Sequence, residues 1–216
     1  MDYPKVIFLD AVGTVFGVRS SVGQIYRDLA QTANVDVNAG ILDKAFLKHF
    51  RAAPPMAFPK VERTQVPAHE YRWWHTIARQ TFDAAGVLPQ FADFDRFFAD
   101  VYAYFAKADP WQVYPDTLKI LEHWHHQGTP LGVVSNFDSR LNAVLDALDL
   151  KRFFSSVTFS TEVGAAKPDS RIFNAALAKH NCRPAEAWHI GDSREQDYQG
   201  AKAAGLHGIW IKRKPS

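Results

Sequence analysis

The sequence contains a single cysteine, Cys182, in 216 residues. One thiol excludes both an internal disulfide framework and a metal site built from several thiolates. Long apolar runs are missing too. The stretch Val6–Leu9 ends at Asp10, far short of a secretory signal or of the roughly 18 apolar residues in a membrane helix. We therefore expect a soluble, cytoplasmic protein with no membrane partner.

An excess of charge of one sign is also lacking. The 25 Lys and Arg residues nearly balance the 23 Asp and Glu residues and leave a formal net charge of +2. Proteins that bind the nucleic-acid backbone concentrate basic side chains, so we expect no nucleic-acid partner. What is present is the composition of a folded chain, 47% hydrophobic and 22% charged, and its length favours one domain with an insertion.

Five short apolar runs have the pattern of buried strands. Their near-continuous content of Val, Ile, Leu, Phe and Trp is typical of strands covered on both faces of a parallel sheet. Stretches of helical period separate the last four runs, and this alternation predicts βαβ units. The predicted fold class is therefore α/β, with a doubly wound, Rossmann-like parallel sheet. The expected strands are Lys5–Asp10, Pro130–Ser135, Ser156–Phe159, Ala187–Gly191 and His207–Ile211.

A long segment after the first strand breaks this rhythm and has only helical patterns. The sequence therefore predicts a helical cap over residues 16–107, inserted into a core made of residues 1–15 and 108–216. The helices expected in the cap cover residues 21–33, 41–50, 68–86 and 91–106.

Aromatic residues of this predicted cap are candidates for substrate contact. Two interpretations of Trp73 and Trp74 are open: a roof over the active site, or part of the cap's own apolar core. We favour the second, because the core is the usual place for aromatic residues on a helix. Phe58 lies in a stiff, proline-rich loop over residues 54–59. Because such a loop presents side chains at a modest entropic cost, we expect Phe58 to contribute to substrate specificity.

Polar residues follow several of the predicted core strands at their carboxyl ends. In a doubly wound sheet, ligands bind outside this edge, near the point where the strand order reverses. Carboxylate, hydroxyl and ammonium groups gathered there suit a phosphate and a divalent metal ion. The residues concerned are Asp10, Thr14, Ser135, Asn136, Lys167, Asp192 and Asp197.

Four segments that contain these residues resemble the motifs of the haloacid dehalogenase superfamily of hydrolases, in the order typical of that superfamily. The helical insertion after the first motif resembles the subfamily whose cap lies there. Shorter segments, among them Arg72-Trp73-Trp74, are similar to the group typified by haloacid-dehalogenase-like hydrolase domain-containing protein three. The four segments are Asp10–Thr14, Val133–Asn136, Lys167–Asp169 and Gly191–Asp197.

This resemblance implies a Mg²⁺-dependent enzyme that acts on a small phosphorylated molecule. Asp10 would be the catalytic nucleophile and would form an aspartyl-phosphate. Mg²⁺ would be held by Asp10, the carbonyl of Val12 and Asp192, while Asp197 would bind a metal-bound water or orient its neighbours. The residues expected to bind the phosphate are Thr14, Ser135, Asn136 and Lys167.

One residue departs from the phosphatase pattern. Phosphatases of this superfamily carry a second aspartate two positions after the nucleophile, where this chain has Val12. That aspartate protonates the leaving group and activates water, a contribution of about 10² to 10⁴ in rate.

Three interpretations of this departure stay open. The protein is a phosphatase that is slow or selective for good leaving groups, a dehalogenase or phosphonate hydrolase that needs no acid there, or a catalytically silent binding or regulatory protein. The pair Asp192 and Asp197 favours a metal-bound phosphorus substrate, because the dehalogenase branch does not use this arrangement.

Overall fold

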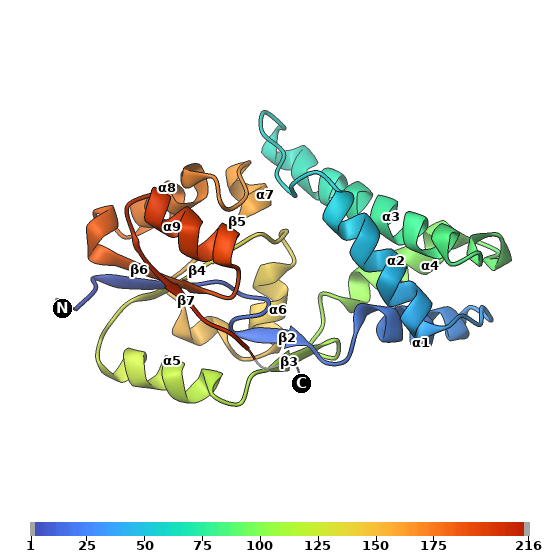
Figure 1. Cartoon of the computed structure of the whole chain (residues 1–216), viewed down its shortest axis with the longest axis horizontal. Helices are drawn as coiled ribbons and strands as arrows, with labels where there is room; N and C mark the ends of the chain where they lie inside the picture. The colour runs from blue at the N-terminus through green and yellow to red at the C-terminus, as the bar shows by residue number, and fades with distance from the viewer. Residues whose placement is uncertain (1–2, 214–216) are drawn as a thin grey trace.

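A five-stranded parallel sheet forms the centre of one part of the molecule (Figure 1). The computed structural model describes residues 3–213. Each of the five predicted strands is present, in the spatial order β5-β4-β1-β6-β7. The predicted α/β fold class is therefore confirmed. The strands are β1 (Val6–Leu9), β4 (Leu131–Ser135), β5 (Ser156–Phe159), β6 (Ala187–Gly191) and β7 (His207–Trp210).

Helices cover both faces of this sheet, as its buried strands require. In β1, Ile7 and Leu9 pack into the apolar cluster on one face, whereas Val6 and Phe8 pack into the cluster on the other. Side chains alternate between the faces along a strand, so a strand in the middle of the sheet needs apolar residues at every position. In Figure 1, α5 and α6 lie on one side of the sheet, and α8 and α9 on the other. These helices are α5 (Thr117–His126), α6 (Leu141–Ala147), α8 (Ser170–Lys179) and α9 (Gly200–Ala203), with a short α7 at Ser160–Val163.

The remaining helices form a separate layer beside the sheet and share an apolar cluster of their own (Figure 1). Aromatic rings dominate this cluster; Tyr26 and Phe82, for example, stack with their ring centroids 5.5 Å apart. All four helices expected from the sequence are present, and none of the helices in residues 3–213 has the length and apolarity needed to cross a membrane. The helices are α1 (Val22–Thr32), α2 (Ala39–Ala52), α3 (Val66–Ala84) and α4 (Phe94–Tyr104).

Two short strands, which the sequence did not predict, connect this helical layer to the sheet. The chain leaves the core along β2 (Phe16–Val18) and returns along β3 (Trp111–Val113), and the two strands pair antiparallel. The rings of Phe16 and Trp111 meet edge to face at 5.3 Å and belong to the apolar cluster on the sheet. The division of the chain at residues 16 and 107 stays a prediction.

Buried polar contacts hold the helical layer against the core. The carboxylate of Glu70, on α3, is fully buried and accepts hydrogen bonds from the backbone N–H of Ser139 (3.0 Å), from the Ser139 hydroxyl and from the Thr161 hydroxyl. The indole N–H of Trp74 donates to Asp138 at 2.6 Å. Because a buried carboxylate is costly without such donors, these contacts fix the position of α3 over the core.

Candidate active site

Three carboxylates gather at the carboxyl edge of the sheet. Asp10 follows β1, Asp192 follows β6, and Asp197 lies in the helical turn after it. One oxygen from each carboxylate lies within 4.8 Å of the others. Asp10 and Asp197 are buried, whereas Asp192 is exposed. The structure therefore brings together three acidic residues that the sequence placed at this edge, and their mutual repulsion requires a compensating cation.

Lys167 supplies one such positive charge from within the protein. Its Nζ donates to Asp10 Oδ1 at 2.7 Å, to Asp197 Oδ1 at 2.5 Å and to the carbonyl of Val134 at 2.9 Å. Burial on its own would lower the pKa of Lys167, but the charges of Asp10 and Asp197 outweigh it and raise the pKa above its usual value. Lys167 is therefore a fixed ammonium whose three N–H groups are all used within the site.

Asp197 is held by three donors at once. Besides Lys167, it accepts hydrogen bonds from His189 Nε2 and from the backbone N–H of Ser193, both at 2.9 Å. Burial would raise the pKa of Asp197, but Lys167 and the hydrogen bond from His189 hold it well below its usual range. A side chain on Gly191 would collide with Asp197, so this close packing needs a glycine there. Asp197 is thus fixed by three donors, and its expected role, to bind a metal-bound water or to orient its neighbours, stays a prediction.

His189 is part of this cluster and was missed at the sequence level. It lies on β6, is fully buried, and its Nε2 carries the proton because the ionised carboxylate of Asp197 can only accept. Burial lowers the pKa of His189, so the ring is neutral. The only signal in the sequence is one polar residue inside an otherwise apolar run.

Asp192 differs from the other two carboxylates because no lysine within residues 3–213 forms an ion pair with it. Partial desolvation and the charges of Asp10 and Asp197 raise its pKa to about 6. The backbone approaches Asp192 at Gly13, whose φ is +89° and where a Cβ would collide with the carboxylate. Hard oxygen donors under mutual repulsion are the ligands that a divalent cation such as Mg²⁺ prefers. The residues present therefore fit a magnesium ion.

Of the residues expected to bind phosphate, Ser135 and Thr14 differ in whether they reach the cavity. Ser135, at the end of β4, lines the cavity described below. Thr14 does not line it, and the hydroxyl of Thr14 is buried with no hydrogen-bond partner among residues 3–213. The phosphate-binding roles of both residues stay predictions.

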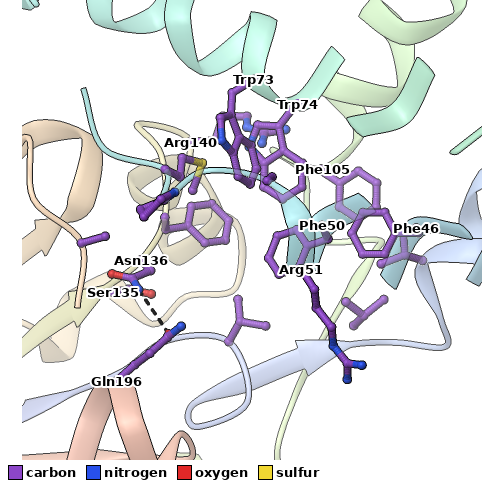
Figure 2. A pocket seen from close by; sticks show the side chains of 18 of the residues that line it. Phe46, Phe50, Arg51, Trp73, Trp74, Phe105, Ser135, Asn136, Arg140 and Gln196 are labelled. Atoms are coloured by element: carbon purple, nitrogen blue, oxygen red, sulfur yellow. Dashed lines mark hydrogen bonds between the residues drawn. The ribbon is translucent and has the colours of Figure 1, made fainter. Parts of the chain in front are cut away.

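The amide of Asn136 is used to hold Lys167. It donates to the Lys167 carbonyl at 3.0 Å and accepts from the Lys167 N–H at 2.7 Å, and its second N–H is directed to Gln196 Oε1 at 3.2 Å (Figure 2). A phosphate role for Asn136 or Lys167 stays a prediction. What the structure adds is that Asn136 fixes the backbone that presents the ammonium.

Arg213 joins the far end of the described chain to this site. Its guanidinium donates to the backbone carbonyl of Thr14 at 2.6 and 3.2 Å and forms an ion pair with Asp116 at 2.5 Å. The ring of Tyr114 lies 4.5 Å from the guanidinium carbon. A residue about 200 positions away in the sequence therefore stabilises the loop after β1 by hydrogen bonds to its backbone.

A cavity of about 720 Å³ extends from these polar groups to the helical layer. This volume is within the range of small-molecule sites. Trp73 and Trp74 line the cavity (Figure 2), and Trp74 also packs against the apolar cluster of the helical layer. The cap-core interpretation therefore holds for Trp74, and the alternative, a place over the site, holds for both residues. Phe58 is not among the lining residues; its ring packs on His69 at 5.4 Å. Other residues of the same proline-rich loop, Pro54 and Pro55, do line the cavity, and the specificity role expected of Phe58 and this loop stays a prediction.

The comparisons with known proteins agree with this geometry. The family model described as haloacid dehalogenase-like hydrolase matches residues 4–205. Haloacid dehalogenase-like hydrolase domain-containing protein 3 of Bos taurus is 33% identical over 208 residues, which cover 96% of this chain and 81% of the relative.

Two solved structures have the same fold. A haloacid dehalogenase-type (HAD) phosphatase from Thermococcus onnurineus has a TM-score of 0.64 at 22% identity, covering 98% of this chain and 87% of that one. A dehalogenase has a TM-score of 0.70 at 18% identity, covering 100% and 88%. At these identities the likeness shows the fold and does not choose between the two reactions. With the sequence match and the site geometry together, this chain belongs to the haloacid dehalogenase-like hydrolase family.

Proposed function

We propose that this hydrolase removes phosphate from a small phosphorylated molecule, with Asp10 as the nucleophile and Mg²⁺ as the cofactor. The observation that carries the proposal is the position of Asp10. Its carboxylate lines the cavity, receives a hydrogen bond from the buried ammonium of Lys167 at 2.7 Å, and shares a carboxylate cluster with Asp192. A fixed cation beside an anionic nucleophile suits attack on an anionic phosphate.

The residues that would hold Mg²⁺ are Asp10, Asp192 and the backbone carbonyl of Val12. Oxygen donors of this type suit a hard divalent cation, and the raised pKa of Asp192 reflects a repulsion that such a cation relieves. When bound, Mg²⁺ supplies the positive charge that lets an anionic carboxylate approach a phosphate. Asp197 is bonded to Lys167, His189 and Ser193 and acts by fixing Lys167.

Asp10 forms the new bond to phosphorus with one carboxylate oxygen. Lys167 binds Oδ1, so attack by Oδ2 leaves that contact in place. As the bond between phosphorus and the leaving oxygen breaks, that oxygen takes the electron pair. Water then attacks the aspartyl-phosphate, releases inorganic phosphate and restores Asp10.

Val12 decides which leaving groups this site can accept. Val12 lines the cavity, and its side chain can neither donate nor accept a proton. The leaving group must depart as an anion, and water must attack the aspartyl-phosphate without a carboxylate base at this position. The enzyme is therefore slow or selective for good leaving groups such as acyl and aryl phosphates.

Release of inorganic phosphate from an activated aryl phosphate and from acetyl phosphate tests this proposal. We expect release that depends on added Mg²⁺ and falls at least about 10³-fold in Asp10→Asn. Asp100→Asn is the matched control, because Asp100 is exposed on α4 and does not line the cavity. If neither compound is hydrolysed, a binding or regulatory protein replaces this proposal.

Dehalogenation and phosphonate hydrolysis remain alternatives for the same nucleophile. Proximity of Asp192 to Asp10 argues against dehalogenation, because carbon–halogen cleavage by a carboxylate gains nothing from a cation site. The cytoplasmic location, the small phosphorylated partner and the exclusion of nucleic-acid and membrane partners stay predictions.

A further inference from the structure

The cap side of the cavity is a wall of aromatic rings. Phe46 stacks on Phe50 with centroids 5.4 Å apart, and Phe50 stacks on Trp74 at 5.9 Å. Trp73 meets Trp74 edge to face at 4.7 Å. Figure 2 shows these side chains grouped together, with Phe105 near them. Phe50 keeps 41% of its surface exposed, so apolar carbon of this ring is accessible to a ligand.

The polar atoms of this wall are already used. The indole N–H of Trp73 donates to the carbonyl of Pro54 at 3.0 Å, and that of Trp74 donates to Asp138 at 2.6 Å. The rings therefore offer carbon surface and not hydrogen bonds. A flat aromatic group is the ligand that such a wall recognises, through stacking and edge-to-face contact.

One cation of the wall has no anionic partner. Arg51, at the end of α2, lines the cavity, is exposed and forms no ion pair with any residue in 3–213. Figure 2 shows its side chain directed from the cap toward the core. Arg140, which also lines the cavity, pairs with Asp138 at 2.6 Å. A guanidinium without a partner suits a carboxylate, which it binds with two parallel hydrogen bonds.

We infer that the substrate is an aryl phosphate whose ring carries an anionic substituent, with the ring against Phe50 and Trp74 and the anion on Arg51. This inference rests on the proposed function and names its substrate class. The reaction balances without an acid at Val12: Asp10 forms the bond to phosphorus, the bond from phosphorus to the aryl oxygen breaks, and that oxygen leaves with the electron pair as a phenolate. A phenol has a pKa near 10, so its anion leaves far more readily than an alkoxide does.

Three phosphates separate this inference from the proposed function: 4-methylphenyl phosphate, 4-(carboxymethyl)phenyl phosphate and acetyl phosphate, each with Mg²⁺. The two phenols have similar acidity, so they differ mainly in the carboxylate. We expect kcat/KM for the carboxymethyl compound to exceed that for the methyl compound by about 2- to 5-fold, the effect of a charge pair at an exposed arginine.

Matched variants locate the effect. In Arg51→Gln, the ratio of kcat/KM for the carboxymethyl compound to kcat/KM for the methyl compound is expected to be close to one. Arg72→Gln, at an exposed arginine of α3 that does not line the cavity, leaves the ratio as it was. In Phe50→Leu, kcat/KM for 4-methylphenyl phosphate divided by kcat/KM for acetyl phosphate falls by about 5- to 10-fold, because the substitution removes a ring contact.

The outcomes are distinguishable. Hydrolysis of acetyl phosphate with equal kcat/KM for the two aryl phosphates overturns this inference and leaves the proposed function standing. So does an unchanged ratio in Arg51→Gln. No phosphate release from any of the three compounds overturns both.

Discussion

The two sides of the cavity are built on opposite principles. On the core side, hydrogen bonds within the protein hold the charged groups in place: Lys167 donates to Asp10 and Asp197, and His189 donates to Asp197. On the cap side, aromatic carbon dominates and Arg51 has no ion-pair partner among the described residues. Fixed charges suit a reaction whose electrostatics are the same for every substrate. An apolar wall that carries Arg51, unpaired within the described part of the chain, suits the choice of substrate.

The largest expected effect comes from placing an acid where the cavity is apolar. Val12→Asp should raise the rate of phosphate release from an alkyl phosphate by about 10²- to 10⁴-fold, because the new carboxyl can protonate an alkoxide as it leaves. Steady-state phosphate release measures the change. Val12→Asn is the control, since it adds polarity without a proton to transfer. An unchanged rate in Val12→Asp would mean that the missing acid does not limit turnover.

Removing the ammonium group of Lys167 should lower both the activity and the stability of the core. Lys167→Met keeps the length of the side chain but leaves Asp10 and Asp197 buried beside each other without their ammonium. We expect kcat to fall by about 10²- to 10³-fold and the free energy of unfolding to fall by about 3–5 kcal/mol.

Urea unfolding and phosphate release measure the two effects separately. Lys44→Met, at an exposed lysine of α2, should change neither. If Lys167→Met retained full activity, the ammonium would be a structural group with no part in the reaction.

The contact between the two sides can be tested at Glu70. Glu70→Ala removes the acceptor for Ser139 and Thr161 and leaves a gap under α3, so the free energy of unfolding should fall by about 3 kcal/mol. Urea unfolding followed by tryptophan fluorescence measures it. Glu62→Ala, at an exposed carboxylate near the start of α3, should stay within about 0.5 kcal/mol of the native protein. Equal stability of the two variants would show that Glu70 does not hold the cap.

The smallest expected effect is the pH dependence of Mg²⁺ binding. Asp192 has a pKa raised to about 6, and only its ionised form binds a cation. The affinity for Mg²⁺ should therefore be constant above about pH 7 and fall by up to about tenfold per pH unit as the pH drops below 6.

Calorimetric titration of Mg²⁺ at several pH values checks this expectation. Asp192→Asn should bind Mg²⁺ more weakly and lose the dependence near pH 6. A native affinity that does not change between pH 5 and pH 7.5 would mean that Asp192 is not a ligand.

Much of the core could be predicted because its strands are long and apolar enough to be recognised locally. β1 and β4 are fully buried, and the polar residues that follow them fall at one edge by topology alone. The β2–β3 pair could not be found in this way. Each strand has three residues, too few for a period, and their pairing joins segments on either side of the whole cap.

The parts of the site that escaped prediction depend on side-chain direction and not on residue type. Trp73 and Trp74 belong to one helix, and their spacing does not say whether the rings face the cap core or the cavity. His189 is one polar residue in an apolar strand, and only the position of Asp197 beneath it reveals its role. Phe58 was favoured because of its stiff loop, but the loop directs the ring to His69.

The support that Arg213 gives to the Thr14 carbonyl has a practical consequence for handling the protein. A protease that removes Arg213, or an affinity tag that displaces it, would take these hydrogen bonds away from the loop beside Asp10. The loop would then be less well held, although the change is made about 200 residues away in the sequence. Expression vectors for this hydrolase should therefore carry the tag at the amino terminus, and mass spectrometry of each batch should verify that Arg213 is still attached before activities are compared.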